Sequence, residues 1–302
     1  MKFDFLSESD QAYYIHKAST LVEALPYIRE HAGQIIVIKY GGHAMGNPKL
    51  SKSFSEDIAL IREIGIQPII VHGGGPQIGK MLKKKNIETQ FIQGLRITDK
   101  QTFEIVYDVL VNEINKEIVN SINETGGKAI GLAGNKDNLI KASKLKVSIK
   151  DNDSKIKKIL DIGFVGEPIK INNEIILDKI KKGYIPVIAP LGTDNNNNYN
   201  INADTVAGFI AGELNASKLL LLTDVAGILN EEKKLISSLS LIESKEIFDK
   251  EFIEGGMKPK ISTCIKAMEK GVAKSTILDG RIPHALILEL FTEHGIGTQI
   301  YS

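Results

Sequence analysis

Short apolar runs rich in isoleucine, valine and leucine alternate with amphipathic stretches along most of this chain. The apolar runs lie at residues 35–38, 69–72, 129–133, 185–189, 219–223 and 275–278. Their length and composition are typical of strands that are buried on both faces of a sheet. Apolar residues at helical spacing mark the stretches at 53–64, 77–85, 102–123, 173–182, 203–214, 241–252 and 259–271. This succession predicts an α/β fold, with an open and mostly parallel sheet between two layers of helices.

Four further segments depart from this alternation. Residues 9–31 have helical spacing with Pro26 as a break, which predicts an extra N-terminal helix that packs on its own domain or docks on another subunit. Residues 139–164 predict a lysine-rich β-hairpin with its turn at 151–154, and residues 91–98 a short strand or hairpin. Residues 192–200 predict a polar loop. We place the boundary between two lobes near residue 190, with a cleft at their junction.

The composition narrows the classes of function. The 302 residues carry 38 basic and 37 acidic side chains, so the net charge of +1 gives no bulk attraction to nucleic acid or to a membrane. Cys264 is the single cysteine, which excludes an intrachain disulfide and a cysteine-built metal site. No apolar run approaches the roughly 20 residues of a membrane span, and MKFDFLSESD lacks the apolar core of a secretory signal. We therefore expect a cytoplasmic enzyme or binding protein.

Two glycine-rich loops follow the first two predicted strands. The sequence IIVHGGG at 69–75 ends in three glycines, and IIVIKYGG at 35–42 repeats the pattern with Lys39 at the end of the strand. Glycines let the backbone approach a bound anion closely, and the N-terminus of a following helix offers free N–H groups. Either loop by itself could be a tight turn without a ligand. Two such loops at one end of a parallel sheet predict a site for an anionic ligand.

Neither loop matches the common nucleotide fingerprints. The P-loop pattern GxxxxGK[ST] is absent, and no GxGxxG closes the first strand, which argues against a dinucleotide-binding protein. Lysines offer another route to phosphate: Lys39 ends a buried strand, and Lys258 or Lys260 begins a helix after Gly255 and Gly256. A cation at a helix N-terminus is repelled by the positive end of the helix dipole, which suggests an anionic ligand that offsets this repulsion. The alternatives, a lysine that reaches the sheet edge or lies on the surface, stay open.

Polar residues also gather before another predicted helix, in the sequence YNINAD. Helix capping explains one of Asn200, Asn202 and Asp204, but not all three. Asp204 could position two lysine ammonium groups, and Asn200 could bind a polar substrate. Arg96, in GLR at 94–96, is a candidate for bidentate binding of a substrate carboxylate, or else forms a surface salt bridge. Lysines, backbone amides and an aspartate, without a nucleophile and its base, fit phosphoryl transfer by charge stabilisation.

Taken together, these motifs resemble those of the amino acid kinase family. The resemblance runs from residue 35 to residue 300 and includes, in order, IIVIKYGG, IIVHGGGPQI, QGLRIT, GFVGE, YNINAD, LLLLTDVAGIL, GGMKPKI and GIGT. Family members that act on glutamate, carbamate, aspartate and UMP share the first loop. The motifs GLRIT, GFVGE and YNINAD favour the branch that phosphorylates N-acetyl-L-glutamate. The implied fold is an open αβα sandwich, here with an extra N-terminal helix.

The resemblance implies a reaction and a role for each matching residue. ATP, with Mg²⁺ held mainly by its own oxygens, would transfer its γ-phosphoryl group to the γ-carboxylate of N-acetyl-L-glutamate in arginine biosynthesis. Residues 33–190 would form the acetylglutamate lobe and residues 191–302 the ATP lobe. The implied catalytic residues are Lys39, Lys260 and Asp204, which orients both lysines. The implied binding residues are Gly74, Gly75, Arg96, Asn200 and Asn202 for acetylglutamate, and Gly41, Gly42, Thr223, Asp224 and Gly227 for the nucleotide.

The resemblance also implies assembly and regulation. Arginine-inhibited members of that branch carry a helix like residues 1–32, which interlaces dimers, and an effector segment like HALILELFTEHGIG at 284–297. We therefore expect a homohexamer, built as a trimer of dimers, and feedback inhibition by L-arginine. Binding of a PII-type signalling protein stays open. The rival functions are a sister kinase for another small acid, a sensing module for nucleotides or amino acids and, more remotely, an oxidoreductase.

Overall fold

The computed structural model describes residues 3–150, 157–253 and 255–302. The strands are β1 (Ile35–Tyr40), β2 (Gln67–His72), β3 (Phe91–Ile92), β4 (Leu95–Arg96), β5 (Ala129–Ala133), β6 (Ile140–Lys144), β7 (Val147–Lys150), β8 (Lys157–Leu160), β9 (Val165–Ile171), β10 (Ile185–Ala189), β11 (Leu191–Thr193), β12 (Asn198–Ile201), β13 (Lys218–Thr223), β14 (Ser238–Ser240), β15 (Lys274–Asp279) and β16 (Thr298–Tyr301). The helices are α1 (Glu8–Glu23), α2 (Leu25–His31), α3 (Pro48–Glu63), α4 (Gly75–Lys84), α5 (Lys100–Tyr107), α6 (Asn115–Glu124), α7 (Asn173–Lys181), α8 (Ala203–Glu213), α9 (Leu241–Phe248), α10 (Met257–Glu269) and α11 (Ala285–Phe291), with 3-10 turns at Phe3–Phe5 and Gly42–Gly46 and a π-helical segment at Asp108–Ile114.

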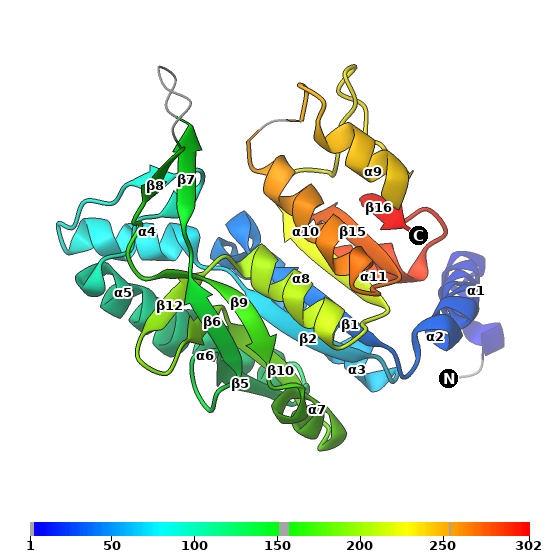
Figure 1. The fold of residues 1–302 in the computed structure, drawn as a ribbon. Helices are drawn as coiled ribbons and strands as arrows, with labels where there is room; N and C mark the ends of the chain where they lie inside the picture. The colour runs from blue at the N-terminus through cyan, green and yellow to red at the C-terminus, as the bar shows by residue number, and fades with distance from the viewer. Residues whose placement is uncertain (1–2, 151–156, 254) are drawn as a thin grey trace.

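One eight-stranded sheet forms the centre of the protein (Figure 1). Its strand order is β14-β16-β15-β13-β1-β2-β10-β5. Neighbouring strands are parallel from β15 through β13, β1, β2 and β10 to β5, and β16 runs antiparallel to β15. Side chains of β1 alternate between the two faces: Ile36 and Ile38 join a core with α3, α6 and α11, while Val37 joins a core with α7, α8 and α10. The predicted α/β fold with an open, mostly parallel sheet is confirmed.

A second group of strands corrects the prediction of a polar loop at 192–200. β6, β9, β11 and β12 close into a small barrel beside the sheet, and β11 pairs antiparallel with β12. The asparagine-rich run is only the turn of this hairpin. Asp194 accepts hydrogen bonds from the backbone N–H of Asn196 at 2.9 Å and of Asn197 at 2.6 Å, and Asn195 has a left-handed φ of 78°. Asparagine tolerates that conformation, so this polar run forms the turn that joins two paired strands.

The hairpin predicted at 139–164 is only partly correct. β7 pairs with β8 as expected, from Val147 opposite Leu160 onward, and the predicted turn at 151–154 lies outside the described residues. The outer part is wrong, because β6 pairs with β9, with Ile140 opposite Ile171. Apolar alternation marks each strand but does not say which distant strand completes its hydrogen bonds.

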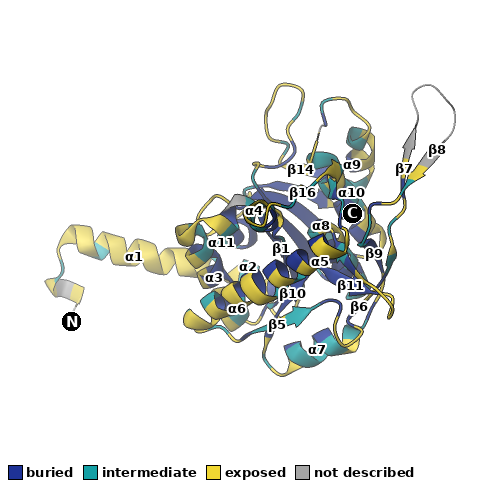
Figure 2. Cartoon of the chain, turned by 90° about the vertical axis from the view of Figure 1, so that its left-hand side faces the viewer, coloured by how far each residue is buried: buried dark blue, intermediate teal, exposed yellow. Residues whose placement is uncertain are grey.

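Two predicted helices are interrupted, and a third is shorter than expected. Residues 9–31 form α1 and α2, with Pro26 in the first turn of α2, and α1 extends from the body without a buried residue (Figure 2). The helix predicted at 102–123 contains the π-helical segment Asp108–Ile114 between α5 and α6. The helix predicted at 241–252 ends at Phe248. Within the described residues, no helix has the length and apolar character of a membrane span.

Candidate active site

The two glycine loops lie side by side because their strands are neighbours in the sheet. Lys39 is opposite Val71 and Tyr40 is opposite His72 in the parallel pair of β1 and β2. The first residue beyond β2, Gly73, donates its backbone N–H to the Tyr40 carbonyl at 2.7 Å. A pocket of about 280 Å³ opens at this edge, and it is lined by Lys39, Gly42, Gly73, Gly74, Gly75, Ile78, Phe91, Gly94, Leu95, Arg96, Leu110, Val165, Pro190, Asn200, Ile201, Asn202, Ala203, Asp204 and Lys260.

Two lysines from distant parts of the chain share one buried carboxylate in this pocket. Asp204, in the first turn of α8, lies with one oxygen 3.1 Å from Lys39 Nζ and the other 2.7 Å from Lys260 Nζ. Burial alone would raise the pKa of Asp204, but the charges of Lys39 and Lys260 outweigh it and lower the pKa to about 2. One carboxylate neutralises only one of the two positive charges. The arrangement therefore keeps excess positive charge at the mouth of both glycine loops, where an anion would be attracted.

Gly41 makes room for the first of these lysines. A Cβ at this position would come within 2.8 Å of Lys39 Nζ, closer than side chains pack. The absence of a side chain thus lets the ammonium group lie against the backbone of the loop, among the groups that would bind a phosphate. Gly41 itself does not line the pocket, whereas Gly42 does.

Arg96 is a buried cation without a carboxylate partner among the described residues, so it does not form the surface salt bridge that the sequence left open. It is 9% exposed, and burial lowers its pKa. Its guanidinium donates to Thr89 Oγ1 at 2.9 Å and to the Gly75 carbonyl at 3.2 Å, and lies 4.6 Å from the centre of the Phe91 ring. These neutral contacts fix the guanidinium and leave its charge uncompensated. An anionic ligand would supply the missing charge.

The remaining predicted residues divide into two groups. Asn200, within β12, and Asn202 both line the pocket, and Asn202 also caps α8 by accepting from the Thr205 N–H at 3.0 Å. Thr223, Asp224 and Gly227 do not line it. Thr223 ends β13, and the Asp224 carboxylate lies against Gly42, where it would overlap an added Cβ; Gly227 lies instead against Thr298. The structure thus brings the candidate substrate residues together and leaves most candidate nucleotide residues outside the lining of this pocket.

Sequence reasoning missed Phe91, whose ring lies under the Arg96 guanidinium. Phe91 and Arg96 are directly opposite each other in the antiparallel pair of β3 and β4. The signal was present in FIQGLR, because a tight turn at Gln93 and Gly94, both with left-handed φ, sets these two residues face to face.

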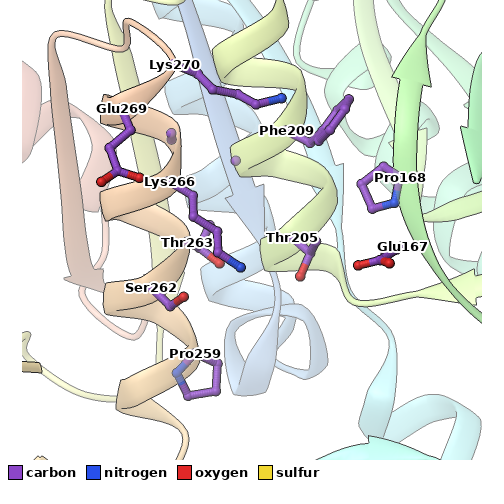
Figure 3. Close-up of a pocket in the computed structure, with 12 residues that line it drawn as sticks. Glu167, Pro168, Thr205, Phe209, Pro259, Ser262, Thr263, Lys266, Glu269 and Lys270 are labelled. Atoms are coloured by element: carbon purple, nitrogen blue, oxygen red, sulfur yellow. The ribbon is translucent and has the colours of Figure 1, made fainter. Parts of the chain in front are cut away.

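A larger groove of about 500 Å³ lies between α8, α10 and β9 (Figure 3). Two of its charged residues already have partners: Lys270 Nζ lies 3.0 Å from Glu213 and 3.8 Å from the centre of the Phe209 ring, and Glu269 lies 2.6 Å from Lys245 Nζ. It contains no glycine loop and neither Lys39 nor Arg96. We therefore place the candidate active site in the smaller pocket, where buried charge is uncompensated.

Comparison with known proteins identifies the family of this chain. A sequence model of the amino acid kinase family matches residues 34–279. The chain belongs to the amino acid kinase family. Within that family, it is 51% identical to an acetylglutamate kinase of Rhodospirillum centenum, over 95% of this chain and 94% of that protein. It is 53% identical to an acetylglutamate kinase of Solidesulfovibrio magneticus, over 94% of this chain and 96% of that protein.

Solved structures show the same amino acid kinase fold in proteins with other activities. N-acetylglutamate synthase from Neisseria gonorrhoeae, complexed with coenzyme A and N-acetyl-glutamate, superposes with a TM-score of 0.82 at 24% identity, over 94% of this chain and 63% of that one. Giardia carbamate kinase superposes with a TM-score of 0.62 at 17% identity, over 90% of this chain and 99% of that one. At these identities the likeness concerns the fold alone.

Proposed function

We propose that this protein transfers the γ-phosphoryl group of ATP to the γ-carboxylate of N-acetyl-L-glutamate, giving N-acetyl-L-glutamyl 5-phosphate in arginine biosynthesis. The observation that carries the proposal is the pair of ammonium groups of Lys39 and Lys260 on the buried Asp204. They share one pocket with the guanidinium of Arg96, which has no carboxylate partner in the part of the chain that the structure describes. Acetylglutamate kinases about half identical over nearly the whole chain support the choice of substrate.

The proposed mechanism uses charge and position. A carboxylate attacks phosphorus without losing a proton, so the site needs no general base. Negative charge on the transferring group is stabilised by Lys39 from β1 and Lys260 from α10, and Asp204 holds both ammonium groups in place. Gly41 and Gly42 supply backbone amides to the phosphates, and Gly74 and Gly75 supply amides to the acceptor.

We place the acceptor substrate in the lobe formed by residues 33–190, with its α-carboxylate on Arg96 and its polar groups on Asn200, assisted by Asn202. ATP lies on the lobe formed by residues 191–302, along Thr223, Asp224 and Gly227. Both oxygens of Asp204 are engaged by lysines, and within the described residues no group of three or more histidine, cysteine, aspartate or glutamate side chains could hold a metal ion. Mg²⁺ would therefore be bound mainly by the ATP oxygens.

A substrate panel tests the proposal. ADP release is measured with ATP and Mg²⁺ against N-acetyl-L-glutamate, L-glutamate, L-aspartate and carbamate, and hydroxylamine traps the acyl phosphate as a hydroxamate. We expect turnover and hydroxamate only with N-acetyl-L-glutamate. Preference for another acid would indicate a sister kinase, and tight binding without any turnover would indicate a sensing module.

Replacing Arg96 by lysine tests how the acceptor is recognised. Lysine keeps one positive charge but loses the planar fork and the contacts to Thr89 and Phe91. We expect the KM for acetylglutamate to rise about 10- to 100-fold, as for the loss of a charged hydrogen bond, with little change in the KM for ATP. Arg62→Lys is the matched control, since among the described residues its guanidinium donates only to the backbone carbonyls of Ile66 and Ile180, and Arg62 does not line the pocket. An equal rise in both KM values would contradict this role.

We also propose feedback inhibition by L-arginine and a homohexameric assembly. A second pocket, of about 470 Å³, lies between α2 and the segment 284–297. Its carboxylates, among them Glu30 and Glu289, suit a guanidinium, and Lys218 and Lys274 suit an α-carboxylate. Large apolar side chains on α1 are exposed, with Leu21 71% and Val22 69% accessible, as expected of a helix that packs on a second copy.

Two N-terminal deletions separate assembly from inhibition. Removing residues 1–24 deletes α1 but keeps Glu30 and His31 in the second pocket. Removing residues 1–32 deletes α1 and these two pocket residues as well. We expect a smaller oligomer from either deletion by light scattering, weakened arginine inhibition from the longer one, and retained phosphoryl transfer in both. An unchanged hexamer after removal of 1–32 would rule out the interlacing role.

A further inference from the structure

A buried pair of polar side chains lies behind the second glycine loop and has no part in the mechanism above. His72, the last residue of β2, is fully buried, and Asn115, the first residue of α6, is 5% exposed. His72 Nδ1 lies 2.9 Å from the Gly73 carbonyl oxygen, and His72 Nε2 lies 3.1 Å from Asn115 Nδ2. The same Asn115 nitrogen donates to the Val187 carbonyl at 2.9 Å. These contacts form one continuous chain from β10 to the glycine loop.

The contacts determine which imidazole nitrogen carries the proton. Asn115 Nδ2 has two hydrogens, of which one goes to Val187 and the other to His72, so His72 Nε2 must accept. The proton of a neutral imidazole is then on Nδ1, where it is donated to the Gly73 carbonyl. Burial lowers the pKa of His72 to about 4, so the ring is neutral near pH 7.

The hydrogen bond from His72 Nδ1–H to the Gly73 carbonyl fixes the Gly73–Gly74 peptide, which faces the substrate pocket. The Gly73 N–H is already held by the Tyr40 carbonyl, and His72 now holds the Gly73 C=O. A trans peptide is planar, with its N–H opposite its C=O, so fixing the Gly73 carbonyl also fixes the Gly74 N–H in the opposite direction. Among the described residues that N–H has no acceptor, and Gly74 lines the pocket.

Packing holds the chain of contacts in place from both sides. A Cβ on Gly74 would come within 2.6 Å of Leu110 and 2.8 Å of Ile114, both in the π-helical segment, so the loop lies directly on that segment. The extra residue of a π-turn shifts the following helical register, and Asn115 is the first residue after it. On the other side, the Asn115 amide oxygen lies against Gly131 of β5, where any added Cβ would overlap it.

We propose that His72, held in its Nδ1–H tautomer by Asn115, is a positioning residue that directs the Gly74 N–H to the anionic acceptor substrate. The inference rests on the proposed function for the identity of that acceptor. Loss of the His72 donor frees the Gly73–Gly74 peptide to rotate, and the amide is then no longer presented to the carboxylate. Binding of the acceptor weakens, while ATP binding is unaffected because the nucleotide contacts other loops.

Two amide substitutions at His72 separate positioning from simple packing. In His72→Asn the side-chain NH₂ takes the place of Nδ1–H and can still donate to Gly73, whereas in His72→Gln it takes the place of Nε2 and cannot. We expect His72→Gln to raise the KM for acetylglutamate about 10- to 100-fold above that of His72→Asn, as for other groups that orient a binding residue. The KM for ATP should stay the same in both. Nitrogen-15 NMR of the wild-type ring should show a protonated Nδ1 and an unprotonated Nε2.

Three results would overturn the proposal: an Nε2–H tautomer in the wild type, equal KM shifts in the two variants, or a parallel rise in the KM for ATP. If His72→Gln does not fold, Gly131→Ala perturbs Asn115 from the far side and must raise the KM for acetylglutamate alone. A wild-type protein that does not phosphorylate acetylglutamate would disprove the proposed function instead. The NMR measurement would then decide by itself whether His72 has the Nδ1–H tautomer that the contact with Asn115 requires.

Discussion

Replacing Lys39 or Lys260 by alanine is expected to lower kcat about 10²- to 10³-fold, the usual cost of removing one charge-stabilising group from an active site. Each ammonium group neutralises charge that develops as the phosphoryl group is transferred, so the loss falls on the transition state more than on bound substrate. The KM values should change much less. Steady-state kinetics with acetylglutamate and ATP, together with thermal unfolding to confirm folding, measures this effect.

Lys258→Ala is the matched control for Lys260→Ala. Lys258 lies two residues earlier in the first turn of α10, and it neither lines the pocket nor pairs with Asp204 in the described residues. We expect its kcat to stay within about twofold of wild type, as for surface substitutions. An equal loss in Lys258→Ala would show that the wrong lysine has been chosen. Full turnover in both Lys39→Ala and Lys260→Ala would favour a sensing module over an enzyme.

The glycine loops and their lysine were predictable because each depends on local sequence. A β-branched run forms a buried strand whether or not its neighbours are known, and parallel strands end at the same edge of the sheet. The positions of Lys39 and Gly74 follow from those two facts. Local sequence did not decide between Lys258 and Lys260. That choice depends on which side chain reaches Asp204, and Lys260 lies 56 residues from Asp204 in the sequence.

The parts that sequence reasoning missed depend on contacts between distant segments. The pairing of β6 with β9 joins strands on either side of the β7–β8 hairpin, and apolar alternation is equally compatible with one long hairpin. The π-helical segment has no sequence signature, because its apolar residues fit helical spacing as well as any others. The π-helical segment packs against Gly74 and sets the position of Asn115, and both features are visible only in the three-dimensional structure.

Asp204→Asn should reduce both activity and stability, because it leaves the ammonium groups of Lys39 and Lys260, whose side chains are only 11% and 15% exposed, without a counter-charge. Removing one partner of a buried ion pair typically costs about 3–5 kcal/mol in the free energy of unfolding, and here two cations lose the same partner. We expect urea unfolding at pH 7 to show a loss of this size. The loss in kcat should approach that of the lysine variants, because neither ammonium group is then held in place.

The pH dependence of this loss gives an independent check. The pKa of Asp204 is about 2 in the folded protein against a reference value of 3.8, so its carboxylate stabilises the fold fully above the reference value. That contribution disappears as the pH falls through about 2. The difference in unfolding free energy between wild type and Asp204→Asn should therefore be constant near neutral pH and shrink in acid. A difference that does not change down to pH 2 would indicate a packing defect rather than a lost charge.

Asp178→Asn provides the matched control, since Asp178 also pairs with two lysines, but on the surface. Its carboxylate lies 2.9 Å from Lys182 and 3.6 Å from Lys179 and is 47% exposed, so water already screens both contacts. We expect neither kcat nor the unfolding midpoint to change. A further Lys39→Met substitution in the Asp204→Asn background removes one uncompensated charge, and should therefore recover stability without recovering turnover. That separation would show that Asp204 holds the two lysines together against their own repulsion, and that the lysines in turn are kept for phosphoryl transfer.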